Sequence, residues 1–508
     1  MSVPKLSGRR SNGDNIDMDP QIESPARPNP DPALPGASLP PVPEDSGGPG
    51  FWALLREALV GSRRNLTTMP LGRAIFLLAI PMVLEMAMES IFTLADIFWL
   101  AHVSPEAVAT AGLTETLMTL IYTAAMGLAI GVGAVVARRT GAQDRAGAGR
   151  AAVQAVVLGL AASVVVGVAG ALAGPSLLAL MGASPEVLST GAGFSRIMLG
   201  GSGTVVMLFL LNAAFRGAGD AALTLRTLAL SNTINIVLGP VLIFGLGPAP
   251  RLGVTGAAVA TTIGRGIGVL YQLRNLARGA GRLHVPRSEV RIDRETLRTI
   301  LTIARSAVWQ VFIGTSSWIF LTRIIANFGS QVLAGYTLAM RVVMFTLLPS
   351  FGLGNAAATL VGQSLGAGNP ARGEQAVWRA AFYNLIFLGG VGLVLFLGPE
   401  VVLRFFTTNP VVVAEGARCL RIVSVGYPLY AYAMVVSQAF NGAGNSKTPT
   451  RINLACFWLF EIPLAFLLTR ALGVGSWGVY VAIPLAFSAM AISSIVLFRR
   501  GKWKTVKI

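Results

Sequence analysis

The sequence predicts an all-α integral membrane protein whose twelve transmembrane helices form two six-helix bundles. Of its 508 residues, 53% are hydrophobic and 12% are charged, and the mean hydropathy is +0.65. A globular protein carries about twice that charged fraction. Long apolar stretches recur along the chain, each able to cross a hydrocarbon core of about 30 Å. The segment Ala-Phe-Arg-Gly-Ala-Gly-Asp at 214–220 also returns at 439–445 as Ala-Phe-Asn-Gly-Ala-Gly-Asn, 225 positions later.

The same offset of 225 relates other positions in the two halves. It pairs Gly141 with Gly366, Asp144 with Asn369, and Leu113 with Leu338. A soluble solenoid repeats every 20–50 residues or so, so a repeat this long indicates duplication of a whole bundle. Six spans per bundle is an even number. Both bundles therefore enter the membrane from the same side, and a pseudo-twofold axis along the membrane normal relates them.

Twelve apolar stretches are predicted as spans, in chain order: 74–101, 108–137, 151–173, 188–214, 222–245, 253–273, 299–326, 331–360, 377–398, 411–438, 452–470 and 475–498. The predicted organisation is a disordered cytoplasmic tail at 1–50, an interfacial segment at 51–70, a first lobe at 71–273, a basic cytoplasmic linker at 274–298, a second lobe at 299–498 and a basic cytoplasmic tail at 499–508.

The N-terminal tail differs from the rest of the chain. It is rich in Pro, Gly, Ser and Asp, and such a composition cannot bury enough surface to become ordered. It lacks the apolar core and cleavage site of a secretory signal. The residues that follow, from Phe51, fit either a short amphipathic helix on the membrane surface or an ordered linker.

The net charge of +17 does not indicate a nucleic-acid partner. The basic residues gather in alternate loops, and seven arginines lie between Arg274 and Arg298. This is the positive-inside bias, which predicts a multi-pass protein of a bacterial inner membrane with both termini in the cytoplasm. The bilayer is thus the expected surrounding.

The sequence offers no metal or cofactor site and no catalytic motif. Cys419 and Cys456 lie in predicted spans, and His102 and His284 lack ligand partners. The glycines at 131–133 and 264–268 lie inside apolar helices, where they indicate close helix packing rather than phosphate binding. There is no P-loop, nucleophile elbow or paired His–Glu motif, so neither an enzyme nor an ATP-driven pump is expected.

Acidic residues in the first span are the main candidates for chemistry. At about 100° per residue, Glu89 lies about 40° and Asp96 about 20° from Glu85, so the three carboxyls share one stripe with Phe92 between them. Acids on one face of a span must face the bundle interior or a wet cavity. The alternative, most open for Glu85 and Glu89, is pairing that only holds helices together. Candidate partners are the arginines Arg196, Arg265 and Arg341.

The three acids of this stripe have no acidic counterparts in the second half. Their counterparts at the 225 offset are Gln310, Gly314 and Leu321. We therefore expect the first half alone to handle a cation. A buried carboxyl resists ionisation, so it can exchange a proton for an organic cation near neutral pH.

Three further residues are assigned to the substrate pathway, and one proline to bending. Glu461 is the lone acid well inside a span of the second half, and Glu115 lies near the outer end of the second span. Phe92 joins them because it lies on the acidic stripe. Pro81 precedes Glu85 by one turn and is the predicted point at which the first helix bends.

Several stretches resemble the multidrug and toxic compound extrusion (MATE) transporters. They lie at 96–101, 107–113, 216–220, 253–261, 340–341, 349–354 and 362–369. The resemblance covers about residues 70–500. It implies two six-helix lobes around a V-shaped central cavity, and export of cationic or amphipathic compounds in exchange for H⁺ or Na⁺.

Carried over residue by residue, the resemblance places a coupling-ion site at Asp96, Asn235 and Thr261, with Glu85 and Glu89 nearby. Many relatives carry a second aspartate where this chain has Gly239 before Pro240. That departure favours protons over Na⁺ and a branch resembling the DNA-damage-inducible-protein-F-like members.

The sequence supports two candidate functions. The first is a monomeric antiporter that exports small organic cations or amphipaths by alternating access, with a coupling ion and no cofactor. The alternative is a lipid or lipid-linked oligosaccharide flippase, whose cavity would need arginines. The spans contain Arg196, Arg265, Arg305, Arg323 and Arg341. The acids share one stripe and the arginines do not, which favours the antiporter.

Overall fold

The computed structural model describes residues 50–62, 64–279, 281–285, 289–506 and 508. The tail predicted at 1–50 lies outside the described residues except for Gly50, and so does part of the linker at 274–298. All of the described residues belong to one structural unit. Its regular structure, within the described residues, is helical throughout.

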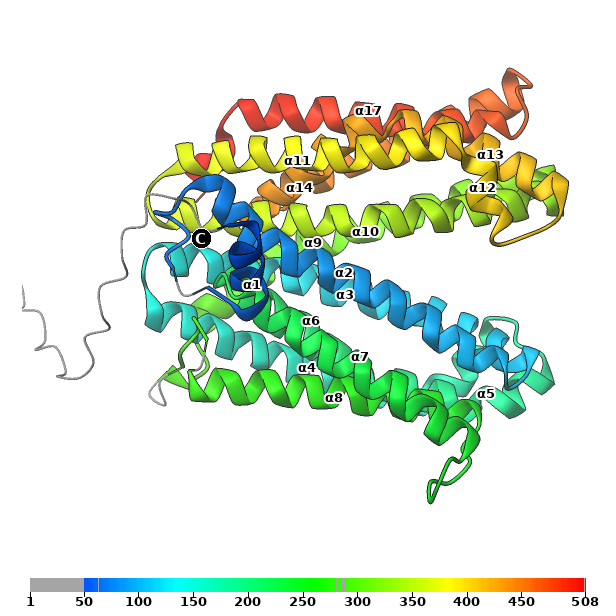
Figure 1. The fold of residues 1–508 in the computed structure, drawn as a ribbon, viewed down its shortest axis with the longest axis horizontal. Coiled ribbons are helices and arrows are strands. Elements are labelled where there is room, and N and C mark those ends of the chain that lie inside the picture. The colour runs from blue at the N-terminus through cyan, green and yellow to red at the C-terminus, as the bar shows by residue number, and fades with distance from the viewer. Residues whose placement is uncertain (1–49, 63, 280, 286–288, 507) are drawn as a thin grey trace, which may run out of the picture. The chain divides into compact units, whose positions relative to one another are not determined.

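The described part of the first half forms eight helices (Figure 1): α1 (Phe51–Val60), α2 (Leu71–Ala101), α3 (Pro105–Gly141), α4 (Arg145–Leu180), α5 (Pro185–Gly200), α6 (Ser202–Gly217), α7 (Ala221–Phe244) and α8 (Val254–Arg278). The α5–α6 pair forms one apolar span.

The second half repeats this order with one irregular span. Its helices are α9 (Arg294–Ile325), α10 (Ser330–Gly366), α11 (Pro370–Leu397), α12 (Pro399–Arg404), α13 (Pro410–Val425), α14 (Tyr427–Gly442), α15 (Lys447–Asn453), α16 (Ile462–Phe466) and α17 (Trp477–Arg499). Two π-helical segments flank α16, namely η3 (Leu454–Glu461) and η4 (Leu467–Ala471). Short 3₁₀ turns lie at η2 (Ala326–Phe328) and η5 (Lys502–Thr505).

The predicted fold class is confirmed, and one span is more polar than the others. Among the described residues, ten helices are long and apolar enough to cross a membrane, and an eleventh span forms if α13 and α14, bent by 60°, count together. Helix α8 is the remaining predicted span. It is 25 residues long but less apolar, because Thr261, Arg265 and Gln272 lie along it. Thr261 and Gln272 are buried, so this polarity faces the protein.

The two halves cross closely where α3 meets α10. A Cβ on Gly141 of α3 would overlap the carbonyl of Gln363 in α10, and a Cβ on Gly366 of α10 would overlap the carbonyl of Arg138 in α3. Residues 138 and 363 differ by 225, as do 141 and 366. The contact is therefore reciprocal. It obeys the pseudo-twofold axis that the sequence repeat predicts.

A second pair of glycines packs in the same way beside this crossing. A Cβ on Gly217 of α6 would lie 2.8 Å from the carbonyl of Gly133, and one on Gly442 of α14 would overlap the carbonyl of Ala358. Four helices are thus closely packed at the end where α3, α6, α10 and α14 finish. We call this the basic end, because Arg138, Arg139 and the basic linker lie there. In Figure 1, the group α10, α11 and α17 lies further from α7 and α8 at the end opposite α1 than at the end where α1 lies.

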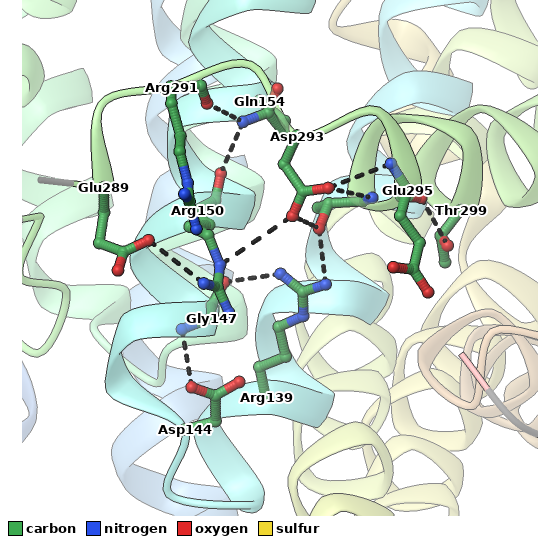
Figure 2. Close-up of polar contacts among 11 residues, drawn as sticks. Arg139, Asp144, Gly147, Arg150, Gln154, Glu289, Arg291, Asp293, Glu295 and Thr299 are labelled. Carbon is green, nitrogen blue, oxygen red and sulfur yellow. Dashed lines mark hydrogen bonds and ion pairs between the residues drawn. The ribbon is translucent and has the colours of Figure 1, made fainter.

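The second part of the linker is attached to the first half at the basic end (Figure 2). Arg150 of α4 lies 3.4 Å from Glu289 and 4.0 Å from Asp293. The Gln154 amide donates to the Arg291 carbonyl at 2.8 Å. The Arg139 guanidinium donates to the hydroxyl of Thr296 at 2.7 Å. These contacts fix the start of α9 against α3 and α4.

Asp293 is the N-cap of α9, and its carboxylate accepts from the amides of Glu295 and Thr296. The hydroxyl and amide of Thr296 donate to this carboxylate and hold the pKa of Asp293 below its usual value. Asp293→Ala should lower the free energy of unfolding at neutral pH by about 1 kcal/mol, the usual worth of a helix cap. Asp293→Asn keeps a capping oxygen and should cost less.

The pH dependence of this contribution has a definite sign. A depressed carboxyl pKa stabilises the fold above the unfolded-state value, and that stabilisation is lost as the pH falls through the folded-state value. The wild-type protein and Asp293→Asn should therefore converge in thermal stability at acid pH and differ most near neutral pH. Thermal unfolding across pH checks this, and a gap that widened on acidification would contradict it.

The C-terminal segment covers the basic end across both halves. Trp503 is fully buried and stacks on Phe498 with ring centroids 4.7 Å apart. The Lys504 ammonium lies 2.6 Å from the Glu374 carboxylate of α11. The Arg138 guanidinium of α3 donates to the carbonyl of Val506. The segment therefore contacts a helix from each half.

The interfacial segment predicted at 51–70 contains a helix followed by turns. Glu57 of α1 accepts from the Arg73 guanidinium at 2.5 Å and from the Ser62 hydroxyl at 2.8 Å. Burial alone would raise the pKa of Glu57, but these hydrogen bonds and the nearby arginines hold it below its usual value. The contact ties α1 to the start of α2.

Candidate functional site

A cavity of about 320 Å³ lies between the two halves. It is lined by seven pairs of residues related by the 225 offset: Met126 and Phe351, Ile130 and Asn355, Gly133 and Ala358, Ala134 and Thr359, Ala213 and Gln438, Arg216 and Asn441, and Gly217 and Gly442. These pairs place part of the cavity on the pseudo-twofold axis, next to the crossing of α3 and α10. Outside the pairs, eleven lining residues come from the first half and one, Leu348, from the second, so the cavity extends into the first half. A site on that axis is accessible to groups from both halves.

The charged lining residues all come from the first half. They are Glu85, Glu89, Arg216 and Arg265. The second half supplies neutral polar groups: the Asn441 amide donates to Gln438 at 2.7 Å, and the Gln438 amide donates to Asn355 at 3.2 Å. The cavity is therefore asymmetric, because the first half supplies most of its lining and all of its charged groups.

Glu85 is engaged by three donors and is only 2% exposed. Its carboxylate accepts from Arg216 at 3.2 Å, from Asn212 at 3.3 Å and from the Thr224 hydroxyl at 3.0 Å. These donors come from α6 and α7. A buried carboxylate needs such partners to offset its desolvation. Glu85 thus joins α2 to two neighbouring helices at the cavity wall.

Glu89, one turn further along α2, is much freer. Its side chain is 41% exposed, and its nearest cation is Arg265 of α8 at 4.0 Å. Arg265 also donates to the Tyr122 hydroxyl at 3.4 Å and lies 5.7 Å from the ring centre of Phe92. Since Glu89 lines the cavity, its exposed surface includes the cavity. Phe92 itself is buried beneath Arg265 and is not a lining residue.

Asp96 lies two turns beyond Glu89 on α2 and is partly buried. Among the described residues, no side chain makes a hydrogen bond or ion pair to its carboxylate. It lies outside the lining of the cavity. Glu115 of α3 is exposed, and it is likewise not a lining residue.

The predicted partners Asn235 and Thr261 are together. The Asn235 amide donates to the Thr261 hydroxyl at 2.7 Å, and both residues are buried between α7 and α8. Asp96 makes no hydrogen bond to this pair. A Cβ on Gly239 would meet nothing within 4 Å. The chain therefore has room for the second aspartate but does not carry it.

Two other predicted residues have clear positions. Glu461 lies at the end of η3 in the core of the second half, 1% exposed, and accepts from the Ser317 hydroxyl at 2.8 Å. It does not line the cavity. Pro81 lies inside a continuous α2. The backbone just after it, at Met82 and Val83, is in direct contact with Gly352 of α10.

The polar residues of the cavity that were not predicted from the sequence include Arg216 in the first half, and Asn355, Gln438 and Asn441 in the second. The repeat itself carried a partial signal. The two duplicated heptapeptides differ at their third position, Arg216 and Asn441, and at their seventh position, Asp220 and Asn445, and both differences change the charge. Arg216 and Asn441 line the cavity, whereas Asp220 and Asn445 do not. The substitutions inside the repeated motif therefore narrow the candidates to two positions, and the structure selects the third.

Comparison with known proteins identifies the family. The MatE family model matches residues 81–241 and again residues 307–467. The chain belongs to the MatE family. The two matches begin 226 residues apart and give each half one copy. The family prediction is confirmed, whereas the branch within the family stays a prediction.

Curated MatE relatives match along most of their length. The "Probable multidrug resistance protein NorM" of Thermotoga maritima is 24% identical, over 84% of this chain and 92% of its own. The "Probable multidrug resistance protein YoeA" of Bacillus subtilis is 26% identical, over 89% and 98%. The "FAD transporter" of Shewanella oneidensis is 24% identical, over 86% and 96%.

Solved MatE-type structures share the fold. A structure described as an "Outward-facing conformation of a multidrug resistance MATE family transporter of the MOP superfamily" aligns with a TM-score of 0.81 and 26% identity, covering 87% of this chain and 98% of that one. This MatE chain is accordingly a multi-pass membrane transporter of small molecules and not an enzyme.

Proposed function

We propose that this transporter exports cationic or amphipathic compounds across a bacterial inner membrane in exchange for protons, by alternating access. The observation that carries the proposal is the cavity between the two halves, whose charged lining residues all come from the first half. The multidrug resistance names of several relatives support the substrate class. The resemblance to a drug exporter drawn from the sequence agrees with it.

Alternating access requires the basic end to open and close. In this structure α3, α6, α10 and α14 are in backbone contact there, so a path from that end to the cavity needs the two halves to separate. The reciprocal glycine contacts and the C-terminal segment are the interactions that would break. A ligand can drive that change only by binding the two states with different affinity.

Glu89 and Asp96 are the carboxyls best placed to exchange a proton for an organic cation. Glu85 accepts hydrogen bonds from three donors, so its protonation would weaken the bonds from Arg216, Asn212 and Thr224. Glu89 has only one distant cation. Asp96 lies about 10 Å further along the helix axis. A proton and a cationic substrate would then compete for the same side of α2.

A sodium ion fits this site less well. It would need several oxygen ligands, and the hydroxyl oxygen of Thr261 already accepts a hydrogen bond from the Asn235 amide. With glycine at 239, one carboxylate, Asp96, is left beside neutral groups.

Proteoliposomes test the coupling ion directly. With ethidium as the transported cation, we expect an imposed proton gradient to drive efflux and an imposed Na⁺ gradient at constant pH to drive little. The same gradients imposed on vesicles without protein measure the passive leak of ethidium. Efflux that followed Na⁺ and ignored the proton gradient would overturn proton coupling while leaving drug export in place.

The orientation is a separate prediction. We expect the basic end, including both termini, to face the cytoplasm, because the arginine-rich segments lie there. Single cysteines at Arg294 and at Ser189, near opposite ends of the spans, should react with an impermeant thiol reagent from opposite sides. The native Cys419 and Cys456 are buried, so the unmodified chain is the control. Labelling of both positions from one side would contradict the twelve-span arrangement.

A second candidate function is transport of an anionic cargo. Arg216 and Arg265 both line the cavity, and one relative is named an FAD transporter. A solved structure described as "Reverse polarity of binding pocket suggests different function of a MOP superfamily transporter from Pyrococcus furiosus Vc1 (DSM3638)" aligns with a TM-score of 0.81. Both arginines here lie near carboxylates, which favours the cationic cargo. FAD accumulation in proteoliposomes, with no ethidium efflux, would favour this alternative or the lipid-linked flippase.

A further inference from the structure

A second cavity, of about 430 Å³, lies on the surface of the second half between α9 and the segment α15–η3. It shares no lining residue with the central cavity. We call it the lateral groove. Its walls bring together three cations and several aromatic rings.

A row of side-chain hydrogen bonds joins α9 to the segment α15–η3, the two segments that form the groove. Four carbonyls of α9, at Ile303, Ser306, Gln310 and Ile313, accept from Ser446, Thr450, Asn453 and Trp458 in that order, at 2.7, 2.8, 3.2 and 3.3 Å. The partners are 143 to 145 residues apart, so the helices run parallel. The groove is therefore built on a fixed base rather than formed by mobile side chains.

Three basic residues line the groove: Arg305, Lys447 and Arg451. All three are exposed. Among the described residues, none of them has a salt-bridge partner or a side-chain hydrogen bond. Three converging cations without a counter-charge repel one another, and an anion between them would relieve that repulsion.

The rest of the lining is apolar and aromatic. It includes Trp309, which is 57% exposed, together with Phe312 and Trp458. These residues follow the cations along α9 and η3 in the direction away from the basic end. The groove thus has a charged mouth and an apolar length, which matches a molecule with an anionic head and a hydrocarbon tail.

The depth of the cations in the membrane fits that orientation. Helix α9 has 32 residues and is about 48 Å long, which exceeds a hydrocarbon core of about 30 Å. Because α9 begins in the basic linker, its first dozen or so residues can lie outside the core, and Arg305 is the twelfth. The cations then lie at the headgroup level and Trp309 below them.

We propose that the lateral groove binds one anionic phospholipid from the leaflet at the basic end. Arg305, Lys447 and Arg451 hold its phosphate, and an acyl chain lies along Trp309, Phe312 and Trp458. Basic pockets between transmembrane helices bind such headgroups. A soluble phosphate would use the cations but leave the aromatic wall uncovered. This proposal is independent of the transported substrate.

Quenching of tryptophan fluorescence by brominated lipid tests the proposal in vesicles of phosphatidylcholine. The Trp309→Phe variant defines the share of the signal that comes from the groove. We expect brominated phosphatidylglycerol to half-quench that share at a mole fraction about tenfold lower, or lower still, than brominated phosphatidylcholine, because each basic residue near the surface favours an anionic headgroup. Equal mole fractions for the two lipids in the wild-type protein would overturn the proposal.

Charge-matched variants separate a site from general attraction to the basic end. Replacing Arg305, Lys447 and Arg451 together by Gln should remove the preference for phosphatidylglycerol. Replacing Arg274, Arg278 and Arg298, which are exposed near the same end but do not line the groove, should change it less than about twofold. An equal loss in both triple variants would overturn the site. Displacement of the quenching by millimolar glycerol phosphate would show a soluble anion as the ligand instead.

Discussion

Asp96→Asn is expected to abolish proton-driven efflux of ethidium while leaving the protein folded and inserted. The amide has nearly the shape of the carboxyl but cannot release a proton. No described residue depends on Asp96 for a hydrogen bond or ion pair, so the substitution strands no partner. Efflux in proteoliposomes under an imposed proton gradient should fall to the protein-free leak, and the thermal unfolding temperature should change little.

Glu461→Gln is the matched control in the other half. It is also an isosteric change of a carboxyl inside a span, but Glu461 lies in the core beside Ser317 and outside the cavity. We expect coupled efflux to persist. Leu321, the repeat counterpart of Asp96, is a poorer control, because it is 1% exposed and an amide there would be buried without a partner. Equal loss of coupling from Asp96→Asn and Glu461→Gln would contradict coupling by the first half alone.

Gly366→Ala should cause one of the largest losses of stability that a single added methyl can produce in this protein. The new Cβ would overlap the carbonyl of Arg138. This carbonyl is part of the backbone, so it cannot move aside as the end of a flexible side chain could. Helices α3 and α10 must therefore separate at the basic end. Overpacking a well-packed contact usually costs about 1–3 kcal/mol and sometimes more. We expect a value at or above the upper end of that range, measured by thermal unfolding of the purified protein.

Gly389→Ala provides the comparison. Gly389 lies within α11, and a Cβ there would meet nothing within 4 Å. The substitution should be neutral or slightly stabilising, because alanine favours the helix by up to about 1 kcal/mol. Similar unfolding temperatures for Gly366→Ala and Gly389→Ala would contradict the close crossing of α3 and α10.

The part of the site that the sequence predicted follows from the geometry of a single helix. The 100° step puts Glu85 and Glu89 on one face of α2, and both line the cavity. It does not say which residues from other helices meet them. Arg216 lies 131 positions from Glu85 in the chain, and only the packing of α6 on its neighbours brings it there. Asp96 lies further along the same stripe and beyond the cavity wall.

The span that contains Glu461 shows a different limit of such reasoning. An α-helical step predicts the direction of a side chain only while the helix keeps its period, and π-helical turns change it. Residues Leu454–Glu461 are π-helical, so the direction of Glu461 could not be computed from its position. The hydropathy of α8 did not reveal where its polar groups bond, because their partners lie on other helices: Thr261 accepts from Asn235 of α7, and Gln272 donates to Asn212 of α6.

The reciprocal contact at the basic end also bears on how the chain arose. Residue 141 meets residue 363, and residue 366 meets residue 138; with 225 subtracted from the second half, position 141 meets position 138 in both cases. That is the contact an isologous dimer makes, in which one surface patch binds its own copy. A single six-helix protein could thus have formed this crossing as a homodimer before its gene was duplicated. Fusion then allowed the two copies to diverge, so that one kept a charged cavity wall and the other became neutral.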